Sequence, residues 1–409
     1  MRSLIVLVTC TLVLTACNPD QTATAPTDTP LRAILVTDAK LKTPLTLTPA
    51  SLLFSALGAE QAQTVTATVQ FAGTLTVTTS CAGVVTVSPS LAFVDPYHGT
   101  VFTVTPVGEG NCTITVTDKK GNVAGVAVSV DVGDFWTTAA PMPTPRGGLA
   151  AGVVNGVLYA VGGYGNGAVG TVEAYDPVAN SWTAKAPLPT PRGGLAAGVV
   201  NGVLYAVGGV DQDQNTVGTV EAYDPVANSW TLKAPMPTPR LDLAVGVVNG
   251  VLYAVSGADQ NGNLLNTVEA YDPVANNWTA KAALPTPRRG LAAGVVNGVL
   301  YTIGGYFGFV TVEAYDPGAN TWTAKAALPT PRYYLSAGVL NGLIYAVSGA
   351  DQNGFPIAAV EAYDPVVDSW AAKAPLPTPR YGLAAGVANG VLYAVGGSST
   401  VGTVEAYHP

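Results

Sequence analysis

Short runs in which hydrophobic and polar residues alternate fill most of this chain, and turn-forming residues separate them. Segments such as 64–69, 74–77 and 112–117 alternate with a period of two, which predicts β-strands. From residue 134 to residue 409, further β-rich runs recur in one fixed order. The pattern therefore predicts an all-β protein.

The C-terminal part of the chain repeats one unit of about 46 residues six times. Each unit contains Thr-Pro-Arg, a first β-rich run, Asn-Gly, a second run that ends in Gly-Gly or Ser-Gly, the segment Val-Glu-Ala-Tyr, and a tryptophan. Asn-Gly predicts a type I′ hairpin because both of its residues tolerate positive φ, and the proline after the third run ends that strand. Four antiparallel strands per unit, repeated radially, predict a six-bladed β-propeller at 134–409.

The order of the strands within the repeats also predicts how the propeller closes. The repeat region begins with a tryptophan-bearing fourth-strand segment, 135–138, and ends with a third-strand segment, 403–407. We therefore expect the first segment to complete the last blade, because this closure removes two exposed sheet edges.

The glycine doublet, the tyrosine of Glu-Ala-Tyr and the spaced tryptophan resemble the kelch repeat over about two-thirds of the chain. This resemblance implies a six-bladed kelch β-propeller. In the third and fifth units the doublet is replaced by Ser256-Gly257 and Ser348-Gly349. We expect the backbone to approach as closely there, because serine is small.

The first 17 residues are typical of a bacterial lipoprotein signal. Arg2 is followed by an apolar run, 4–16, that is too short to span a bilayer, and Leu-Thr-Ala-Cys at 14–17 matches the lipobox. We predict lipidation of Cys17 and export; an ordinary signal peptide or an uncleaved anchor is the alternative, and either would also export the chain. Residues 18–30 lack large apolar side chains, which predicts a flexible tether.

Residues 31–133 predict a β-sandwich of seven or eight strands, with a hairpin at 119–122. The segment 110–122 resembles the bacterial immunoglobulin-like domains of surface proteins, which implies a stalk; a separate ligand-binding role is the alternative. After Cys17, only Cys81 and Cys112 remain, and export predicts a disulfide between them. Closing this loop of about 31 residues would stabilise the domain by roughly 3–4 kcal/mol.

Charge and composition restrict the class of partner. Charged residues make up 11% of the chain, and the net charge is −8. Nucleic acid and anionic lipid require a basic surface, so neither is an expected partner. Two isolated cysteines make a poor metal site, and neither a metal nor another cofactor is expected.

In a four-stranded meander, the loops after the second strands and the connections between blades lie at one end of the propeller, which we call the varied face. The units differ from one another almost only there, so it is the candidate binding face. One arginine per unit precedes the innermost strand on this face. These arginines either bind a carboxylate or phosphate, or each pairs with the periodic glutamate of its own unit. They are Arg146, Arg192, Arg240, Arg288, Arg332 and Arg380.

Aromatic and charged residues vary between units on this face. Kelch adaptors of ubiquitin ligases contact peptides through an aromatic residue after the glycine doublet, and Tyr164 and Tyr306 match that position; the resemblance implies a similar mode of binding. Aromatic residues beside arginine are common in recognition sites, and the alternative for each tyrosine is a packed position within its blade. Besides the arginines, the candidate ligand-binding residues are Tyr164, Tyr306, Phe307, Asp242, Arg289, Tyr333, Tyr334 and Tyr381, with Phe309 nearby.

Three polar loops contain Asp-Gln-Asp-Gln-Asn at 211–215 or Asp-Gln-Asn-Gly at 259–262 and 351–354. The first is similar to half of a calcium-binding loop. However, Thr216 occupies the position of the required glycine, and Ala222 occupies the closing position. Turn formation is therefore the preferred interpretation of all three loops.

Few groups in the propeller are suited to catalysis. It contains no cysteine and one histidine, His408, so it lacks Cys-His and Ser-His pairs. Galactose oxidase has the kelch architecture, but its copper site needs histidines and a cysteine-linked tyrosine that this propeller lacks. A sialic acid epimerase remains the enzymatic alternative, because carboxylate and arginine would suffice. The carboxylates outside the repeat template are Asp211, Asp213, Asp242, Asp259 and Asp351.

The sequence thus predicts an exported, lipid-anchored protein, periplasmic or at the cell surface. An immunoglobulin-like stalk would present a kelch propeller for non-catalytic binding of a protein, peptide or glycan. The alternatives are a carbohydrate-active propeller enzyme and a purely structural spacer.

Overall fold

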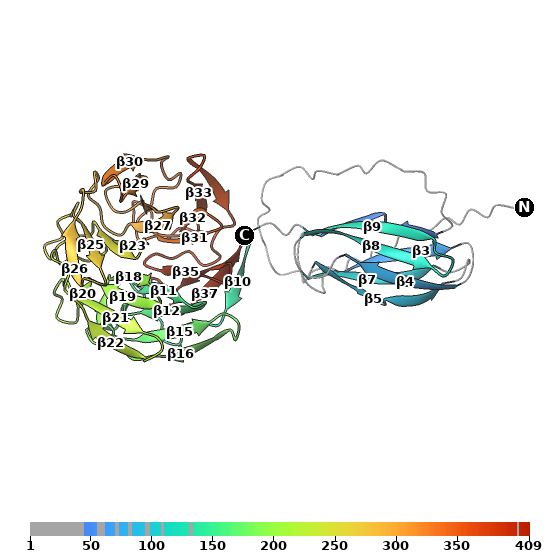
Figure 1. Ribbon diagram of the computed structural model, residues 1–409, viewed down its shortest axis with the longest axis horizontal. Helices are drawn as coiled ribbons and strands as arrows, with labels where there is room; N and C mark the ends of the chain where they lie inside the picture. The colour runs from blue at the N-terminus through green and yellow to red at the C-terminus, as the bar shows by residue number, and fades with distance from the viewer. Residues whose placement is uncertain are drawn as a thin grey trace, which may run out of the picture. The chain divides into compact units, whose positions relative to one another are not determined.

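The computed structural model describes residues 45–54, 62–69, 73–80, 84–94, 99–107, 110–130, 134–398 and 401–409, and every regular element in these ranges is a β-strand. The chain divides into two compact units between residues 133 and 134, and Figure 1 labels the strands of each. None of the described segments forms a helix capable of crossing a bilayer. The predicted signal at 1–17 and tether at 18–30 lie outside the described residues.

The N-terminal unit packs two β-sheets around one apolar core, in which Val65 and Val104 of one sheet join Leu75 and Val126 of the other. Its described part contains nine strands, more than the seven or eight predicted. Four of these strands have only four residues, which are too few to show an alternating pattern in the sequence. One sheet has the order β1 (Leu45–Thr48), β3 (Gln63–Val69), β7 (Thr100–Pro106), β5 (Val85–Ser88). The other has the order β2 (Ser51–Phe54), β9 (Val123–Val130), β8 (Gly110–Asp118), β4 (Gly73–Thr79), β6 (Leu91–Val94).

The predicted hairpin at 119–122 is confirmed, since it connects the antiparallel strands β8 and β9. Asp118 organises the turn by accepting the N–H groups of Lys120 and Asn122 at 2.8 and 2.9 Å. Cys112 lies in β8 and packs partly buried against the core. Its expected partner, Cys81, lies outside the described residues, so the disulfide stays a prediction.

Six four-stranded antiparallel sheets make up most of the described part of the C-terminal unit. The first strand of each sheet packs against the first strands of both neighbouring sheets, so the six sheets surround a common centre (Figure 1).

From the innermost strand outward, the first sheet is β11 (Ala150–Val154), β12 (Val157–Val161), β15 (Val172–Asp176), β16 (Ser181–Ala184), and the second is β18 (Ala196–Val200), β19 (Val203–Val207), β21 (Val220–Asp224), β22 (Ser229–Leu232). The third is β23 (Ala244–Val248), β24 (Val251–Val255), β25 (Val268–Asp272), β26 (Asn277–Ala280), and the fourth is β27 (Ala292–Val296), β28 (Val299–Ile303), β29 (Val312–Asp316), β30 (Thr321–Ala324). The fifth is β31 (Ser336–Leu340), β32 (Leu343–Val347), β33 (Val360–Asp364), β34 (Ser369–Lys373). The sixth is β35 (Ala384–Ala388), β36 (Val391–Val395), β37 (Val404–His408), β10 (Phe135–Ala139). Two short ladders pair β13 (Tyr164–Gly165) with β14 (Gly167–Ala168) and β17 (Arg192–Gly193) with β20 (Val210–Asp211).

The Asn-Gly pairs form the predicted hairpins between the first and second strands. Asn155 and Gly156 have φ values of 50° and 78°, and Val154 pairs with Val157 across the turn. The other five Asn-Gly pairs also have positive φ at both residues. Only residues that tolerate this conformation fit here, which explains why the pair recurs.

Each innermost strand carries a glycine where the neighbouring sheet approaches most closely. A Cβ on Gly152 would lie 2.4 Å from Cδ1 of Leu204, which belongs to the second strand of the next sheet. Leu204 is fully buried. The glycine therefore sets how closely adjacent sheets pack.

The tryptophans connect each sheet to its neighbour. Nε1 of Trp182 donates a hydrogen bond of 2.8 Å to the carbonyl of Ala140, which follows the outermost strand of the preceding sheet. Oδ1 of Asn180 accepts the N–H of Ala140 and the hydroxyl of Tyr175, both at 2.8 Å. The tyrosine and the tryptophan of the repeat therefore have a structural role at every junction between sheets.

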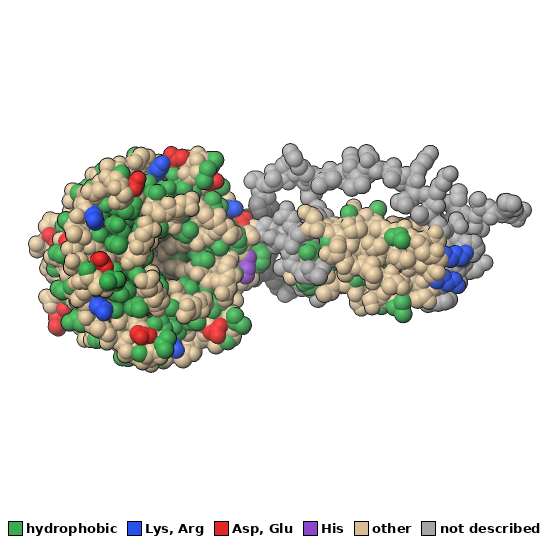
Figure 2. Space-filling view, viewed as in Figure 1, with side chains coloured by type: hydrophobic (Ala, Val, Ile, Leu, Met, Phe, Trp, Pro, Cys, Tyr) green, Lys and Arg blue, Asp and Glu red, His purple; other side chains and the backbone are tan. Residues whose placement is uncertain are grey.

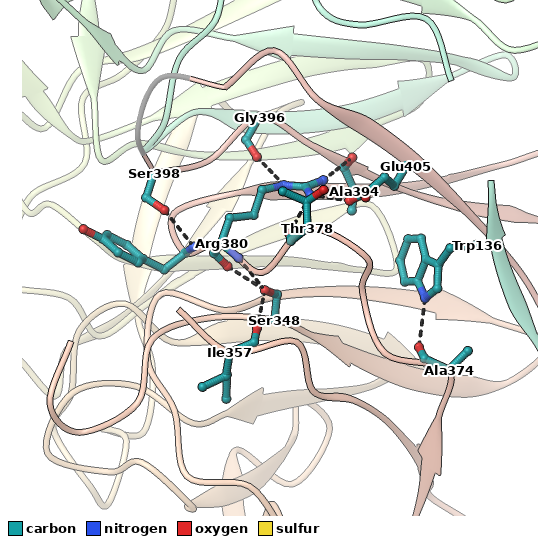
Figure 3. A network of polar contacts seen from close by, with 11 residues as sticks. Trp136, Ser348, Ile357, Ala374, Thr378, Arg380, Ala394, Gly396, Ser398 and Glu405 are labelled. Atoms are coloured by element: carbon teal, nitrogen blue, oxygen red, sulfur yellow. Dashed lines mark hydrogen bonds and ion pairs between the residues drawn. The ribbon is translucent and has the colours of Figure 1, made fainter. Parts of the chain in front are cut away.

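The predicted closure of the ring is confirmed. β10 pairs with β37 along its whole length, beginning with Phe135 opposite His408. Trp136 then makes the junction contact to the preceding sheet, donating to the carbonyl of Ala374 at 2.8 Å (Figure 3). The first strand of the C-terminal unit thus completes the sheet formed by its last three strands.

Two sheets have an aspartate where the other four have the junction asparagine. Oδ2 of Asp134 accepts hydrogen bonds from Ala374 and from the Tyr407 hydroxyl, and Oδ1 of Asp368 accepts the Tyr363 hydroxyl. The hydrogen bond from Tyr363 lowers the pKa of Asp368 below its usual range. Burial raises the pKa of Asp134, but its hydrogen bonds outweigh this effect and lower it overall.

We expect Asp368→Asn to reduce the acid sensitivity of the C-terminal unit. A carboxyl group whose pKa is lower in the folded protein than in the unfolded chain stabilises the fold above about pH 4, the pKa in the unfolded chain. This stabilisation is lost as the pH falls through the lower pKa of the folded state. Asparagine keeps the acceptor oxygen but does not titrate. Tryptophan fluorescence reports on this unit alone, because all six tryptophans lie in it.

The difference in thermal midpoint between wild type and Asp368→Asn should therefore shrink as the pH falls below about 4. Asn320→Asp provides the reverse exchange at an equivalent junction and should add acid sensitivity. A difference that stays constant over this pH range would contradict the assignment.

Candidate functional site

The six periodic arginines are buried and pair with the glutamates of their own sheets. Nη1 of Arg146, just before β11, lies 2.5 Å from Oε2 of Glu173 in β15. The same guanidinium donates to the carbonyls of Gly162 and Ala160 at 2.8 and 3.0 Å. The Thr144 hydroxyl donates to the other carboxylate oxygen at 2.9 Å, so both ends of Thr-Pro-Arg contact Glu173. The pairs are Arg146–Glu173, Arg192–Glu221, Arg240–Glu269, Arg288–Glu313, Arg332–Glu361 and Arg380–Glu405.

This geometry does not support the ligand-binding role considered for the arginines. Each is at most 1% exposed, and a guanidinium without accessible surface cannot contact a ligand. Figure 3 shows the Arg380 guanidinium enclosed by Glu405 and by carbonyl groups of its own sheet. Burial lowers the pKa of Arg240 to about 10, against the opposing effect of Glu269.

Removal of one charge from such a pair should strongly destabilise the C-terminal unit. We expect Glu269→Gln to lower the free energy of unfolding by roughly 3–5 kcal/mol, because Arg240 would keep a buried charge without its counter-ion. Asp213→Asn makes the same change in charge at an exposed position and is the matched control. Chemical unfolding followed by tryptophan fluorescence measures both variants. Equal stabilities would show that the pair is dispensable.

Two residues after each arginine, six backbone amides form a closed ring of hydrogen bonds, which we call the amide ring. All six residues have φ between 50° and 63°. Such values suit glycine but cost other residues about 1–3 kcal/mol, so Asp242 and Tyr334 occupy strained positions. Each N–H donates at 2.7–2.9 Å to the preceding carbonyl, in the cyclic order Gly148, Gly194, Asp242, Gly290, Tyr334, Gly382.

One leucine per unit follows the amide ring. The six leucines are 5–6% exposed, and with the amide ring they line a central cavity of about 90 Å³. Figure 2 shows the C-terminal unit hollowed at its centre. The leucines are Leu149, Leu195, Leu243, Leu291, Leu335 and Leu383.

A larger cavity of about 300 Å³ lies on the varied face, over one side of the amide ring. We call it the Asp242 pocket, because Asp242 is the one charged side chain among the described residues that line it. Ligand sites usually have volumes of roughly 300–1,000 Å³, so this pocket suits a small chemical group. Its walls are Tyr164, Tyr334 and Tyr381, with Gly147, Gly148, Gly165, Gly382, Gly397 and Ser398 completing the lining.

The tyrosine rings lie where the adjacent units have glycine. A Cβ on Gly193 would lie 2.5 Å from Cε2 of Tyr164, and a Cβ on Gly290 would lie 2.7 Å from Cδ1 of Tyr334. These glycines therefore provide the space in which the aromatic walls are seated.

Asp242 and Tyr334 are in direct contact although 92 residues separate them: the Tyr334 hydroxyl donates to Oδ2 of Asp242 at 2.7 Å. Oδ1 accepts no hydrogen bond from the described residues and lies beside Gly194, near the Tyr164 hydroxyl. Burial raises the pKa of Asp242 above its usual range, and the opposing effects of the Tyr334 hydrogen bond and the Arg289 charge offset only part of this. Burial and the nearby Asp242 raise the pKa of Tyr164 to about 12.

The other predicted aromatic residues form a second group, which we call the Tyr306 cluster. The Tyr306 ring packs edge-on against Phe307 and Phe309, with centroids 4.5 and 5.7 Å away, and against Tyr333 at 5.3 Å. Cζ of Arg289 lies 5.5 Å from the centre of the Tyr306 ring. Phe307 is 68% exposed and has a φ of 70°, which is strained for phenylalanine.

The structure therefore divides the predicted site residues into three sets. The Asp242 pocket is lined by Tyr164, Asp242, Tyr334 and Tyr381. The Tyr306 cluster contains Tyr306, Phe307, Arg289 and Tyr333. The six periodic arginines that pair with glutamates are buried. Sequence reasoning missed Ser398 and the amide ring. A glycine at four of the six ring positions was the available signal.

The three polar loops form turns around their own aspartates. Oδ1 of Asp259 accepts the N–H groups of Asn261 and Asn263, both at 2.9 Å, and Asp211 and Asp351 accept equivalent pairs. Within the described ranges, no three His, Cys, Asp or Glu side chains gather as a metal-binding group would require.

Comparison with known proteins places this unit in a fold family. Residues 135–305 match the KLHDC2/KLHL20/DRC7 Kelch-repeats domain, and residues 287–329 and 331–377 match the Kelch motif. The solved structure of YjhT is similar, with a TM-score of 0.58 and 20% sequence identity over 66% of this chain and 95% of that chain. No curated protein matches the chain. The C-terminal unit is a β-propeller built from kelch repeats.

Proposed function

We propose that the kelch propeller binds a protein, peptide or glycan on its varied face without catalysing a reaction. The observation that carries this proposal is the confinement of asymmetry to one face. The six sheets, which we interpret as six blades, share their arginine pairs, hairpins and junction contacts. The Asp242 pocket and the Tyr306 cluster are formed by residues that differ between units.

Two further observations support a binding role. Kelch propellers commonly mediate protein binding. Phe307 exposes 68% of its surface in a strained conformation, next to an arginine that packs on Tyr306. Aromatic and arginine side chains contribute most of the energy at recognition surfaces, which gives this arrangement a physical purpose.

The N-terminal unit completes the proposal. We infer that its two packed sheets form an immunoglobulin-like stalk, with Cys81 and Cys112 joined, and that Cys17 carries a lipid anchor after export. A stalk and a tether would hold the propeller away from a membrane surface and leave the varied face accessible to ligands.

Replacement of Tyr306 and Tyr333 by alanine should weaken binding of any ligand found in a peptide or glycan screen by about tenfold or more, because two central aromatic contacts are lost. The control replaces Val226 and Val274 by serine; these exposed side chains lie in turns at the opposite end of the propeller. Titration calorimetry measures both variants. Unchanged affinity in the tyrosine variant would exclude the Tyr306 cluster from the site.

Replacement of Cys17 by alanine should abolish lipid attachment, because the thiol of the lipobox cysteine is the acceptor. Cys10→Ala, within the apolar run of the signal, should leave it intact. Mass spectrometry of the mature N-terminus and partitioning into detergent measure the result. An unlipidated wild-type protein would contradict the anchor.

The second candidate is a carbohydrate-active enzyme. It is favoured by the hydrogen-bonded Asp242 and Tyr334, a carboxyl and a phenol with shifted pKa values inside a pocket. Exchange between anomers or epimers of a reducing sugar, observed by NMR and lost in Asp242→Asn, would support it over simple binding.

A further inference from the structure

The Asp242 pocket has few hydrogen-bond donors left for a ligand. Nine of its ten lining residues donate their backbone N–H within the protein, and the Tyr334 hydroxyl is donated to Asp242. The remaining side-chain donors are the hydroxyls of Tyr164, Tyr381 and Ser398. An anion needs converging donors or a basic group, and the described residues of the lining include neither lysine nor arginine.

The pocket instead presents negative charge and aromatic surface. Oδ1 of Asp242 lacks a hydrogen-bond donor among the described residues, and the Tyr334 and Tyr381 rings are stacked with centroids 6.3 Å apart. Aromatic faces attract cations because they carry a negative electrostatic potential. We propose that this pocket binds an ammonium group, primary or methylated, with Asp242 as its counter-ion and Tyr164, Tyr334 and Tyr381 as its aromatic walls.

Arg289 leaves Asp242 available to a ligand. The two side chains form no ion pair, and the Arg289 guanidinium is held over the Tyr306 ring outside the pocket lining. Its charge reduces the attraction for a cation without occupying Oδ1. The net charge of −8 adds a long-range attraction for positively charged ligands.

The conformation of the amide ring shows how this site is built. Asp242 and Tyr334 have φ values of 52° and 50° at positions where the other four units have glycine. The strained backbone directs the carboxylate of one unit and the phenol of another toward each other across Gly290. Asymmetry introduced into a symmetric ring thus creates the charge and the walls of the pocket.

This inference rests on the proposed binding function and specifies the ligand's chemistry. Choline and its neutral isostere 3,3-dimethylbutan-1-ol test it with the full chain by titration calorimetry and ligand-observed NMR. Choline should bind at least about tenfold more tightly than the isostere, because the two differ only in charge. Equal affinities, or binding of neither, would overturn the ammonium assignment.

Variants assign the binding to particular side chains. Asp242→Asn keeps the acceptor for Tyr334 and a residue type that tolerates positive φ, so it removes charge with little structural change. It should weaken choline binding about 30-fold or more, and Tyr381→Ala should weaken it about fivefold. Val226→Ser, at an exposed position in a turn at the opposite end of the propeller, should leave it unchanged. Thermal unfolding confirms that each variant is folded, and full choline affinity in a folded Asp242→Asn would refute the proposal.

Two further pairs of probes identify the source of the ammonium group. A lysine tripeptide is compared with its Nε-acetylated form, and glucosamine with N-acetylglucosamine; each pair differs in one positive charge. Preference for the charged member of either pair supports the proposal and names a peptide or an amino sugar. Preference for both acetylated members would overturn the ammonium assignment. Any ligand whose binding is lost in the Tyr306 and Tyr333 double variant would still support the proposed binding function.

Discussion

A buried ion pair in every sheet positions the groups that form the site. Glu173 holds the Arg146 guanidinium, and the chain then needs only two residues to reach the amide ring and three to reach the central leucine. The same short spacing follows every arginine. A buried ion pair adds little net stability over apolar residues of similar size, whereas loss of one partner is costly. Its value here is geometric, since six equivalent pairs bring six backbone segments to equivalent places around one axis.

The features predicted from sequence are those that depend on adjacent residues or on the order of the repeated segments. Asn-Gly predicts a positive φ at two adjacent positions, and the order of the runs predicts that 135–138 completes the sheet formed by the last three strands. The arginines show the limit of this reasoning. Their period equals that of the glutamates, which suits both a buried pair and an exposed ring, and only their position in space distinguishes the two.

The pocket was only partly predictable for a related reason. Four of its residues can be selected from the sequence because they differ from the repeat: Tyr164, Asp242, Tyr334 and Tyr381. That they lie together depends on which sheets face one another across the axis. The hydrogen bond between Asp242 and Tyr334 spans 92 residues and passes over a glycine of the intervening unit. The amide ring is a backbone feature, so its residue types reveal it only through the excess of glycine at one position.

The pairing of β10 with β37 has a consequence for how the propeller is made. β10 leaves the ribosome first among the strands of the six sheets, and β37 leaves it last. Until β37 is available, the edge of β10 lacks the partner that it has in the closed ring. The final closing contact joins segments more than 250 residues apart, for example Thr137 and His408, so its loop-closure entropy is high. The ring therefore completes after translation of its last strand, and until then the nascent chain presents a free strand edge to its surroundings.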